Sequence, residues 1–374
     1  MRGHRPDVII VGGGLIGCAL AAELAARGRA VTVIERAEPG AEASGAAAGM
    51  LAPQSEARTR DAFFDLTIES RDLYPAWVRG LVEETGVDVG YRKTGLLHCR
   101  LEGEAAVARA EPFAWQRAAG LSVIERQRED LAAQAGGRLS PRIRDAVFFP
   151  DEAVVDPRRL TRAAWLAAVR RGAIVQTGTS VLGFRIEDGV CRGVETEAGP
   201  IDAATTVDAA GAWAAFGGRL PVPLPVEPVR GQIVALCLSE PLETIVASDE
   251  VYLVPRPDGT VLLGSTAERV GFRKAVTAEA VAHLIGAAAR LVPGLGSARF
   301  VSAWSGLRPG TPDGLPVLGA SPVRGLFFAA GHFRNGILLA PVTARLLADL
   351  LTSGPSRDLS PFSIERFAPA LQTA

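Results

Sequence analysis

The sequence is poor in the residues that build metal centres and disulfide frameworks. Its 374 residues include four cysteines and four histidines. The cysteines at 18, 99, 191 and 237 form no C-x-x-C pair, and their spacing to the histidines does not match that of metal ligands. No metal site is therefore predicted, and the cysteines are interpreted as small buried side chains in a reducing compartment.

Net charge is also nearly absent. Forty basic residues stand against 41 acidic ones, giving a formal charge of −1, and only Lys93 and Lys274 are lysines. Without an excess of one sign, the chain has no overall field that would attract nucleic acid or an acidic membrane. Neither is predicted as a partner.

Long apolar runs are missing as well, since no stretch approaches the ~20 residues that a membrane-spanning helix needs. The first residues, "MRGHRPDVIIVGGG", begin basic and turn apolar as a secretory signal does. Asp7 and Glu23 interrupt the run, however, and it continues into the strand-like "AVTVIER" without a convincing cleavage site. A cytoplasmic protein is predicted.

What the sequence does contain is a nucleotide-binding pattern near its start. Residues 7–11 are a β-branched run typical of a buried parallel strand, and residues 30–34 repeat it. Between them, Gly12-x-Gly14-x-x-Gly17 opens a helix that Gly28 ends. Gly12 permits a tight turn, Gly14 lets the backbone approach a pyrophosphate, and Gly17 allows close packing of helix and strand. The agreement of strand, helix and glycines predicts a dinucleotide site.

Two further features narrow the choice of dinucleotide. Glu35 follows the second strand, where a carboxylate accepts hydrogen bonds from a ribose diol and disfavours a 2′-phosphate. The next stretch, "EASGAAAGMLAPQSEA" (42–57), is rich in tiny residues, so its backbone can lie against an extended ligand. Together these features favour FAD, while NAD stays open as a weaker alternative.

Four segments carry a resemblance to a known group of flavoproteins. They are "SGAAAGMLAPQSEA" (44–57), "YLVPRPDG" (252–259), "WSGLRPGTPDGLPVLG" (304–319) and "AAGHFRNGILLAP" (329–341). In this order they resemble the glycine oxidases of thiamine biosynthesis, within the superfamily of D-amino acid and sarcosine oxidases. The similarity runs from the first strand to beyond residue 350.

The resemblance implies an α/β fold of two domains. One is a Rossmann-like FAD-binding domain made of residues 1–85, 145–215 and 301–374. The other is a substrate domain built on an antiparallel sheet, from residues 86–144 and 216–300. The sequence is compatible with this, because residues 156–172 are typical of a helix that begins at an Asp-Pro pair, and residues 180–201 of short strands joined at Asp188-Gly189.

The resemblance also implies a reaction. Glycine, or a small amine such as sarcosine or a D-amino acid, would lose a hydride to N5 of a flavin and become an imino acid. Oxygen would reoxidise the flavin to give hydrogen peroxide, and hydrolysis would give glyoxylate and ammonia. No side-chain base is needed if the amine arrives neutral, because the flavin supplies the difficult chemistry.

The substrate's carboxylate is the group that such a site must recognise, and an arginine fork suits it. Arg308 and Tyr252 match the carboxylate-binding pair of the resembled group. The plainer alternatives are a structural ion pair of Arg308 with Asp313, and an ordinary strand aromatic at Tyr252. Arg334 is placed within reach of the same pocket, with the substrate carboxylate or the flavin edge as its partner.

The resemblance assigns the remaining site residues to the cofactor. The predicted FAD contacts are Gly12, Gly14, Leu15, Ile16, Gly17, Glu35, Arg36, Ser44, Ala46, Ala47, Gly49, Met50, Val181, Ala210, Gly211, Trp213, Gly331, His332, Phe333, Arg334, Asn335, Gly336, Ile337 and Leu338. Six of them, Gly331, Phe333, Asn335, Gly336, Ile337 and Leu338, are expected to offer backbone amides to the flavin ring at the start of a helix. The sarcosine oxidases carry a cysteine for covalent flavin attachment just before their C-terminal substrate-binding region. Residues 300–320 contain no cysteine, so the resemblance implies a non-covalent FAD.

Several assignments stay open at this point. Met50 lines the pocket or fills the core, and His332 orients its loop or contacts the site. Glu250 lies two residues before Tyr252, where an acid would alter the substrate range if its loop borders the pocket.

The alternatives for the whole chain are open as well. They are a D-amino acid or sarcosine oxidase, a flavin dehydrogenase with a protein or quinone acceptor, a flavin-binding protein without turnover, and an NAD-dependent dehydrogenase. The resemblance further implies a homotetramer, and a link to thiazole synthase.

Overall fold

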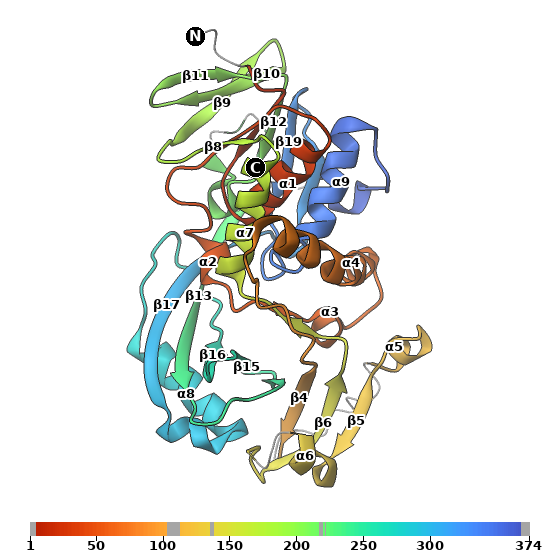
Figure 1. The fold of residues 1–374 in the computed structure, drawn as a ribbon, viewed down its shortest axis with the longest axis vertical. Helices are drawn as coiled ribbons and strands as arrows, with labels where there is room; N and C mark the ends of the chain where they lie inside the picture. The colour runs from red at the N-terminus through yellow and green to blue at the C-terminus, as the bar shows by residue number, and fades with distance from the viewer. Residues whose placement is uncertain (1–4, 103–112, 135–137, 217–219, 221, 368–374) are drawn as a thin grey trace.

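The computed structural model describes residues 5–102, 113–134, 138–216, 220 and 222–367. The small parts of the predicted domains at 1–4, 103–112, 135–137, 217–219, 221 and 368–374 lie outside these residues. The chain forms two bodies, each built on one large sheet, that follow one another along the longest axis of the molecule (Figure 1).

The N-terminal βαβ unit forms as predicted. β1 (Val8–Val11) and β2 (Val31–Ile34) are buried along their whole length and pair in parallel, as their β-branched sequences indicate. α1 (Leu15–Ala26) connects them and ends two residues before Gly28.

This unit is the centre of a six-stranded sheet with the order β18-β19-β12-β1-β2-β8. Its pairs are parallel except for β18 with β19 at the edge. The added strands are β8 (Ile174–Gln176), β12 (Thr205–Asp208), β18 (Val317–Ala320) and β19 (Leu326–Ala330). Strands from three distant parts of the sequence therefore share one sheet.

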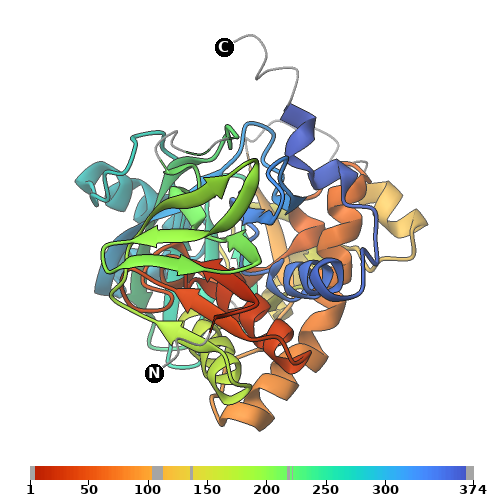
Figure 2. The same ribbon diagram turned by 90° about the horizontal axis from the view of Figure 1, so that it is seen from above.

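Helices and a small sheet enclose this central sheet. α1, α4 (Ala62–Thr85), α7 (Pro157–Arg170) and α9 (Ala340–Thr352) pack together and share one apolar core. On the other side, β9 (Val181–Glu187), β10 (Val190–Thr196) and β11 (Gly199–Asp202) bury Val194 against Ile9 and Val11. Figure 2 views the molecule from the end that carries this small sheet.

Two local predictions are confirmed here. The carboxylate of Asp156 caps α7 by accepting from the backbone N–H groups of Arg158 and Arg159 at 3.0 and 3.1 Å. The turn at Asp188-Gly189 joins β9 to β10, with φ of 49° and 72° as the tight hairpin requires.

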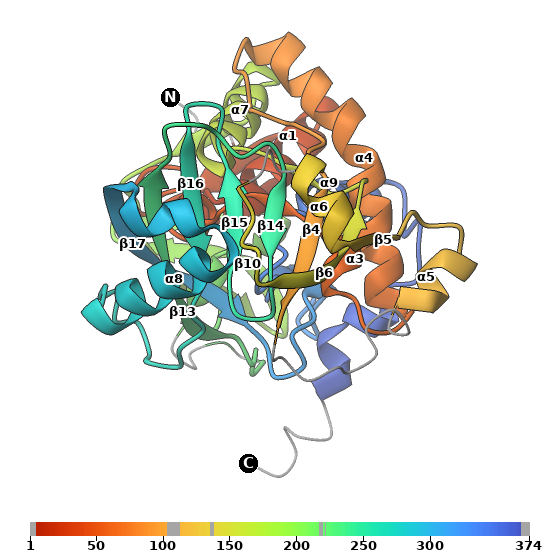
Figure 3. The ribbon, with the colours of Figure 1, turned by 90° about the horizontal axis from the view of Figure 1, so that it is seen from below.

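The second body is an eight-stranded sheet with the order β17-β13-β16-β15-β14-β4-β6-β5. Its pairs are antiparallel except β4 with β14. The strands are β4 (Leu96–Leu101), β5 (Ile124–Gln127), β6 (Ile143–Phe149), β13 (Glu227–Cys237), β14 (Ile245–Ala247), β15 (Tyr252–Pro255), β16 (Thr260–Gly264) and β17 (Arg299–Gly310). α8 (Ala278–Leu291) packs on one face of it (Figure 3), where Leu284 and Leu291 join its core.

Short elements complete the fold. They are α2 (Ala43–Ala46), β3 (Met50–Leu51), α3 (Pro53–Glu56), α5 (Ala114–Ala118), α6 (Arg128–Gln134), β7 (Ala153–Val154) and the 3₁₀ turns Gly211–Trp213, Pro293–Ser297, Ser360–Phe362 and Ile364–Phe367. Within the described ranges, no helix combines the length and apolarity needed to cross a membrane.

The sheets do not follow the predicted domain ranges at two places. β17 pairs along its length with β13, so residues 301–310 belong to the second sheet, whereas the prediction places them in the cofactor domain. β6 likewise pairs with β4, which places residues 145–149 in the second sheet. The division of the chain into domains stays a prediction.

Candidate functional site

A large cavity runs between the two bodies. It encloses about 630 Å³ and is lined by residues of the β1–α1 turn, the loop after β2, and strands β13, β15 and β17. Ligand pockets commonly enclose roughly 300–1,000 Å³. The cavity therefore suits a large or extended small molecule.

The cavity begins at the glycine turn. Gly12 has φ of 108°, and a Cβ added to it would lie 2.5 Å from the carbonyl oxygen of Ala209. A Cβ on Gly17 would lie 2.0 Å from the carbonyl oxygen of Gly12. Both positions thus require glycine, as the sequence predicted, and the turn places the N-terminus of α1 at the cavity wall.

Glu35 lies at the carboxyl end of β2, on the same wall. Its Oε2 accepts from the backbone N–H of Gly13 at 2.7 Å and its Oε1 from that of Ala37 at 2.9 Å. Beside it, the guanidinium of Arg36 stacks 3.7 Å above the ring of Trp213 and pairs with Glu42 at 2.8 Å. This end of the cavity therefore offers an acid and an aromatic–cation pair.

The tiny-residue loop forms the middle of the wall. Ser44 Oγ accepts from the N–H of Leu15 at 3.0 Å, and the carbonyl of Ala46 accepts from Trp304 Nε1 at 2.9 Å. These bonds join the loop to the first turn of α1 and to β17. Met50 lies in β3, where it lines the cavity and also packs against an apolar cluster. It therefore both lines the pocket and fills the core.

Most predicted cofactor contacts do meet at this cavity. Those that line it are Gly12, Gly14, Leu15, Ile16, Glu35, Arg36, Ser44, Ala46, Ala47, Gly49, Met50, Val181, Ala210, Gly211, Trp213, His332, Phe333, Arg334, Asn335, Gly336 and Ile337. Gly17, Gly331 and Leu338 do not line it. Leu338 is buried, and its carbonyl accepts from Ser70 Oγ at 2.6 Å.

Arg308 stands at the other end of the cavity, on β17. Its Nη1 donates to the carbonyl of Thr266 at 3.0 Å, and its Nη2 donates to Ser265 Oγ at 2.6 Å. No carboxylate in the described part of the chain lies within ion-pair distance of it, and Asp313 instead pairs with Arg366 at 2.7 Å. The predicted alternative of a structural Arg308–Asp313 pair is therefore wrong.

Burial lowers the pKa of the Arg308 guanidinium, and the neighbouring Tyr252 hydroxyl and the charges of Arg334 and Glu56 act on it as well. An arginine stays protonated despite such a shift. The cavity thus contains a positive charge that is partly withdrawn from water and paired only with neutral groups.

Two glycines that the sequence analysis did not single out make room for this end. A Cβ on Gly231 would lie 2.2 Å from Nη1 of Arg308, and one on Gly264 would lie 2.4 Å from the ring and hydroxyl of Tyr252. Both are strand residues, in β13 and at the end of β16. Only the pairing of distant strands reveals their function, so no local signal could have found them.

The segment after β19 differs from its prediction. Residues 333–334 and 336–339 form turns, and α9 begins at Ala340. The amides of 333–338 therefore precede the helix instead of forming its first turn. Phe333 has φ of 45°, and its N–H donates to the carbonyl of Pro309 at 2.9 Å. This bond fixes the segment to the strand that carries Arg308.

His332 and Arg334 also have clear partners. His332 is buried, its Nε2 lies 3.1 Å from Thr343 Oγ1, and burial lowers its pKa to about 3. It therefore orients its loop as a neutral side chain. Arg334 is 49% exposed and pairs with Glu56 at 3.1 Å, so its partner within the chain is an acid of the cavity wall.

Glu250 does not border the cavity. Its carboxylate pairs with Arg290 of α8 and lies 3.7 Å from Nε2 of His283. The predicted influence of this acid on the substrate range is therefore not supported by its position.

Two fully buried acids were not identified from the sequence. Glu152 and Asp208 each have one carboxylate oxygen without a partner, and burial raises the pKa of both to about 8. Oε1 of Glu152 accepts from the N–H groups of Gln54 and Ser55 at 2.8 and 3.3 Å, which anchors α3, the short helix that ends at Glu56.

Similar proteins match the chain over nearly its whole length. A glycine oxidase of Geobacillus kaustophilus is 39% identical over 368 residues, covering 97% of this chain and 97% of that protein. The crystal structure of glycine oxidase from Geobacillus kaustophilus superposes with a TM-score of 0.93, covering 97% of this chain and 99% of that one. The bifunctional protein ThiO/ThiG of Trichormus variabilis is 38% identical over 380 residues, and the chain spans only 56% of its length.

The family model described as DAO, FAD dependent oxidoreductase, matches residues 7–350. This span includes the glycine turn, both large sheets and the cavity between them. The chain therefore belongs to the DAO family of FAD dependent oxidoreductases.

Proposed function

We propose that the chain oxidises glycine, and other small amino acids of similar size, with FAD as its non-covalent cofactor. The observation that carries the proposal is Arg308, a partly buried cation whose hydrogen-bonding neighbours in the described chain are all neutral: one carbonyl and the hydroxyls of Ser265 and Tyr252. A small substrate carboxylate would give it the missing negative partner. The similarity to glycine oxidases supports glycine as the substrate.

Arg308 and Tyr252 would hold the substrate. A guanidinium fork donates two parallel hydrogen bonds to a carboxylate, each worth roughly 1.5–3 kcal/mol. The Tyr252 hydroxyl lies beside the guanidinium and can donate a further bond. Because glycine has almost no apolar surface, these polar contacts would carry most of its binding.

The chain fits an FAD molecule along the same cavity. Gly12 and Gly14 would bring the backbone against a pyrophosphate, Glu35 would accept from a ribose, and the amides of residues 333–337 would face the ring. When bound, FAD supplies the acceptor for a hydride from the substrate's α-carbon. The Phe333–Pro309 bond would keep the ring-facing amides in fixed relation to Arg308.

The overall reaction consumes glycine, O2 and water and produces glyoxylate, ammonia and hydrogen peroxide. We propose that the amine arrives neutral, so that no side-chain base is needed to remove its proton.

The proposal extends to the setting of the enzyme. The ThiO/ThiG relatives support supply of an oxidised glycine product to a thiazole synthase. We also propose the cytoplasm as the location of the enzyme. We further propose O2 as the acceptor and a homotetramer as the assembly.

The decisive experiment is the visible spectrum of the purified protein before and after glycine is added without oxygen. Loss of the yellow colour supports the proposal, and a colourless protein contradicts it. Sarcosine, D-alanine and D-proline in the same assay define the substrate range. Peroxide yield per turnover separates an oxidase from a dehydrogenase.

A further inference from the structure

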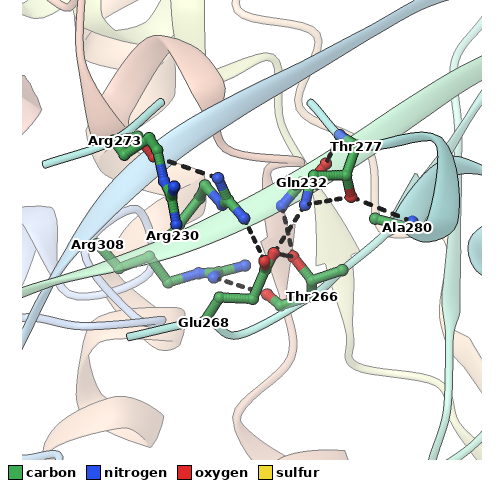
Figure 4. A network of polar contacts seen from close by, with 8 residues as sticks. All are labelled: Arg230, Gln232, Thr266, Glu268, Arg273, Thr277, Ala280 and Arg308. Atoms are coloured by element: carbon green, nitrogen blue, oxygen red, sulfur yellow. Dashed lines mark hydrogen bonds and ion pairs between the residues drawn. The ribbon is translucent and has the colours of Figure 1, made fainter. Parts of the chain in front are cut away.

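A cluster of polar side chains lies behind Arg308 and does not line the cavity (Figure 4). We call it the rear cluster, and it comprises Arg230, Gln232, Thr266, Glu268 and Thr277. Arg230 and Gln232 occupy alternate positions of β13, so they point to one face, and Gly231 between them faces the other, where Arg308 lies. The rear cluster and the cavity thus flank the same strand.

Glu268 is the centre of the rear cluster. Its Oε1 accepts from Gln232 Nε2 at 2.8 Å and from Thr266 Oγ1 at 2.6 Å, while its Oε2 pairs with Arg230 Nη2. The backbones of Arg230 and Glu268 also exchange two hydrogen bonds of 2.9 Å. Glu268 therefore fixes its own segment to β13 through both side chain and main chain.

Thr266 connects the rear cluster to the cavity. Its hydroxyl donates to Glu268 and accepts from the backbone N–H of Gln232 at 3.0 Å. Its carbonyl accepts from Nη1 of Arg308 at 3.0 Å, and the adjacent Ser265 Oγ accepts from Nη2 at 2.6 Å. One residue thus transmits the position of Glu268 to the guanidinium that faces the cavity.

The rear cluster is built for rigidity. Arg230 is 4% exposed, and its charge-assisted hydrogen bonds hold the pKa of Glu268 down at about 2. A buried ion pair is weak evidence for stability, since apolar residues of equal volume often serve as well. The distinct contribution of the rear cluster is to orient Arg308. An arginine side chain that is already held in place loses less conformational freedom when a ligand binds to it.

We propose that Glu268 is a positioning residue, which acts through Thr266 to hold Arg308 in the orientation that receives a substrate carboxylate. This inference rests on the proposed function of Arg308. Glu268 itself touches neither substrate nor cofactor, so its effect falls on carboxylate affinity and leaves FAD binding unchanged.

The test compares Thr266→Val, Glu268→Gln and Glu250→Gln in the FAD-loaded protein. Thr266→Val keeps the side-chain shape but removes the hydroxyl, and Glu250→Gln is a matched control at an acid that pairs with an arginine away from the cavity.

Acetate affinity is measured from the change in the visible spectrum, together with KM and kcat for glycine. We expect acetate Kd and glycine KM to rise about 5- to 30-fold in the first two variants, with kcat and flavin content within twofold. Glu250→Gln should match the wild type.

The inference is overturned if Thr266→Val keeps wild-type acetate and glycine affinity while its unfolding temperature falls, because the rear cluster is then only structural. Should Glu268→Gln fail to fold, Thr266→Val decides alone. Combining Thr266→Val with Arg308→Lys is the second test: a shared effect predicts that the combined loss is smaller than the product of the two losses, and independent losses contradict it. A failure of the proposed function gives a different result. The wild-type protein itself then neither binds acetate nor is reduced by glycine, and both the proposed function and the role of Glu268 are contradicted.

Discussion

The guanidinium of Arg308 lies directly against the α-carbon of Gly231, where an added Cβ would be 2.2 Å from Nη1. A methyl group at this position must displace the arginine, because real Cβ atoms essentially never approach so closely. We expect Gly231→Ala to raise KM for glycine by roughly 10- to 100-fold, equivalent to about one charge-assisted hydrogen bond. Steady-state kinetics with glycine measures this.

A matched control is Gly286→Ala in α8, where an added Cβ meets nothing within 4 Å. It should leave KM unchanged and raise the unfolding free energy by about 0.5–1 kcal/mol, because alanine is the better helix former. Equal KM values for the two variants would show that the close approach does not position Arg308.

Arg308→Lys keeps the charge but loses the fork. A single ammonium cannot reproduce two parallel hydrogen bonds, so we expect glycine KM to rise by roughly 10- to 100-fold. Flavin content, read from the ratio of visible to ultraviolet absorbance, should stay that of the wild type. A variant with unchanged KM would mean that the substrate carboxylate binds elsewhere.

Gly12→Ala tests the other end of the cavity. Its Cβ would lie 2.5 Å from the carbonyl of Ala209, at a φ of 108° that alanine rarely adopts. The turn must then deform, and we expect bound FAD to fall by about tenfold or more, since a misplaced backbone loses several hydrogen bonds. Gly80→Ala in α4, with nothing within 4 Å of its added Cβ, is the control and should keep its flavin. Full flavin retention by both variants would contradict the assigned site.

Glu152 gives the protein a predictable pH dependence. Burial raises its pKa from 4.5 to about 8, so the folded chain keeps this proton while the unfolded chain releases it above pH 4.5. Stability should therefore fall as pH rises from about 4.5 to 8. Glu152→Gln removes this contribution, and its advantage over the wild type should reach on the order of a few kcal/mol at pH 8.

Urea unfolding at pH 5 and pH 8, with FAD in equal excess, measures the difference. The side-chain carbonyl of the Glu152→Gln variant can accept from the N–H groups of Gln54 and Ser55 as the glutamate does. The hydrogen bonds that anchor α3 are therefore retained. Parallel pH profiles for wild type and variant would show that Glu152 is ionised in the folded protein.

Glu56 and Arg334 form an ion pair at the cavity wall, and each partly neutralises the charge of the other. Both residues line the cavity, and their atoms lie 3.1 Å apart. Removing the acid with Glu56→Gln leaves Arg334 to attract an anionic carboxylate, so glycine KM should fall about two- to fivefold, the scale of an exposed ion pair. Arg334→Gln should raise KM by a similar factor. Changes in the same direction for both variants would contradict a charge effect.

The local patterns of the sequence predicted much of the fold. The βαβ unit, the Asp156 cap and the Asp188-Gly189 turn each depend on residues close together in the chain, so their signals are complete within one segment. The helix-like apolar spacing of "GHFRNGILLAP" predicts a helix that starts earlier than α9 does. The structure forms turns there instead, and Phe333 has a positive φ.

The site was predicted less completely, for a physical reason. Arg308 and Tyr252 belong to recognisable segments, but Gly231 and Gly264 contact them only through strand pairing across the second sheet. Glu268 is connected to Arg308 through Thr266, whose hydroxyl donates to Glu268 and whose carbonyl accepts from Arg308. Likewise, the sequence predicts a ligand as the partner of Arg334. Its partner within the chain is Glu56, which lies 278 residues away, so no local pattern indicates this ion pair.

The most direct test of the account is an anaerobic titration of the purified yellow protein with glycine, run side by side on the wild type and Arg308→Ala. We predict that the wild type loses its visible flavin absorbance, and that the variant keeps it at the same glycine concentration while retaining its flavin. Bleaching of Arg308→Ala at wild-type glycine concentrations would contradict the account.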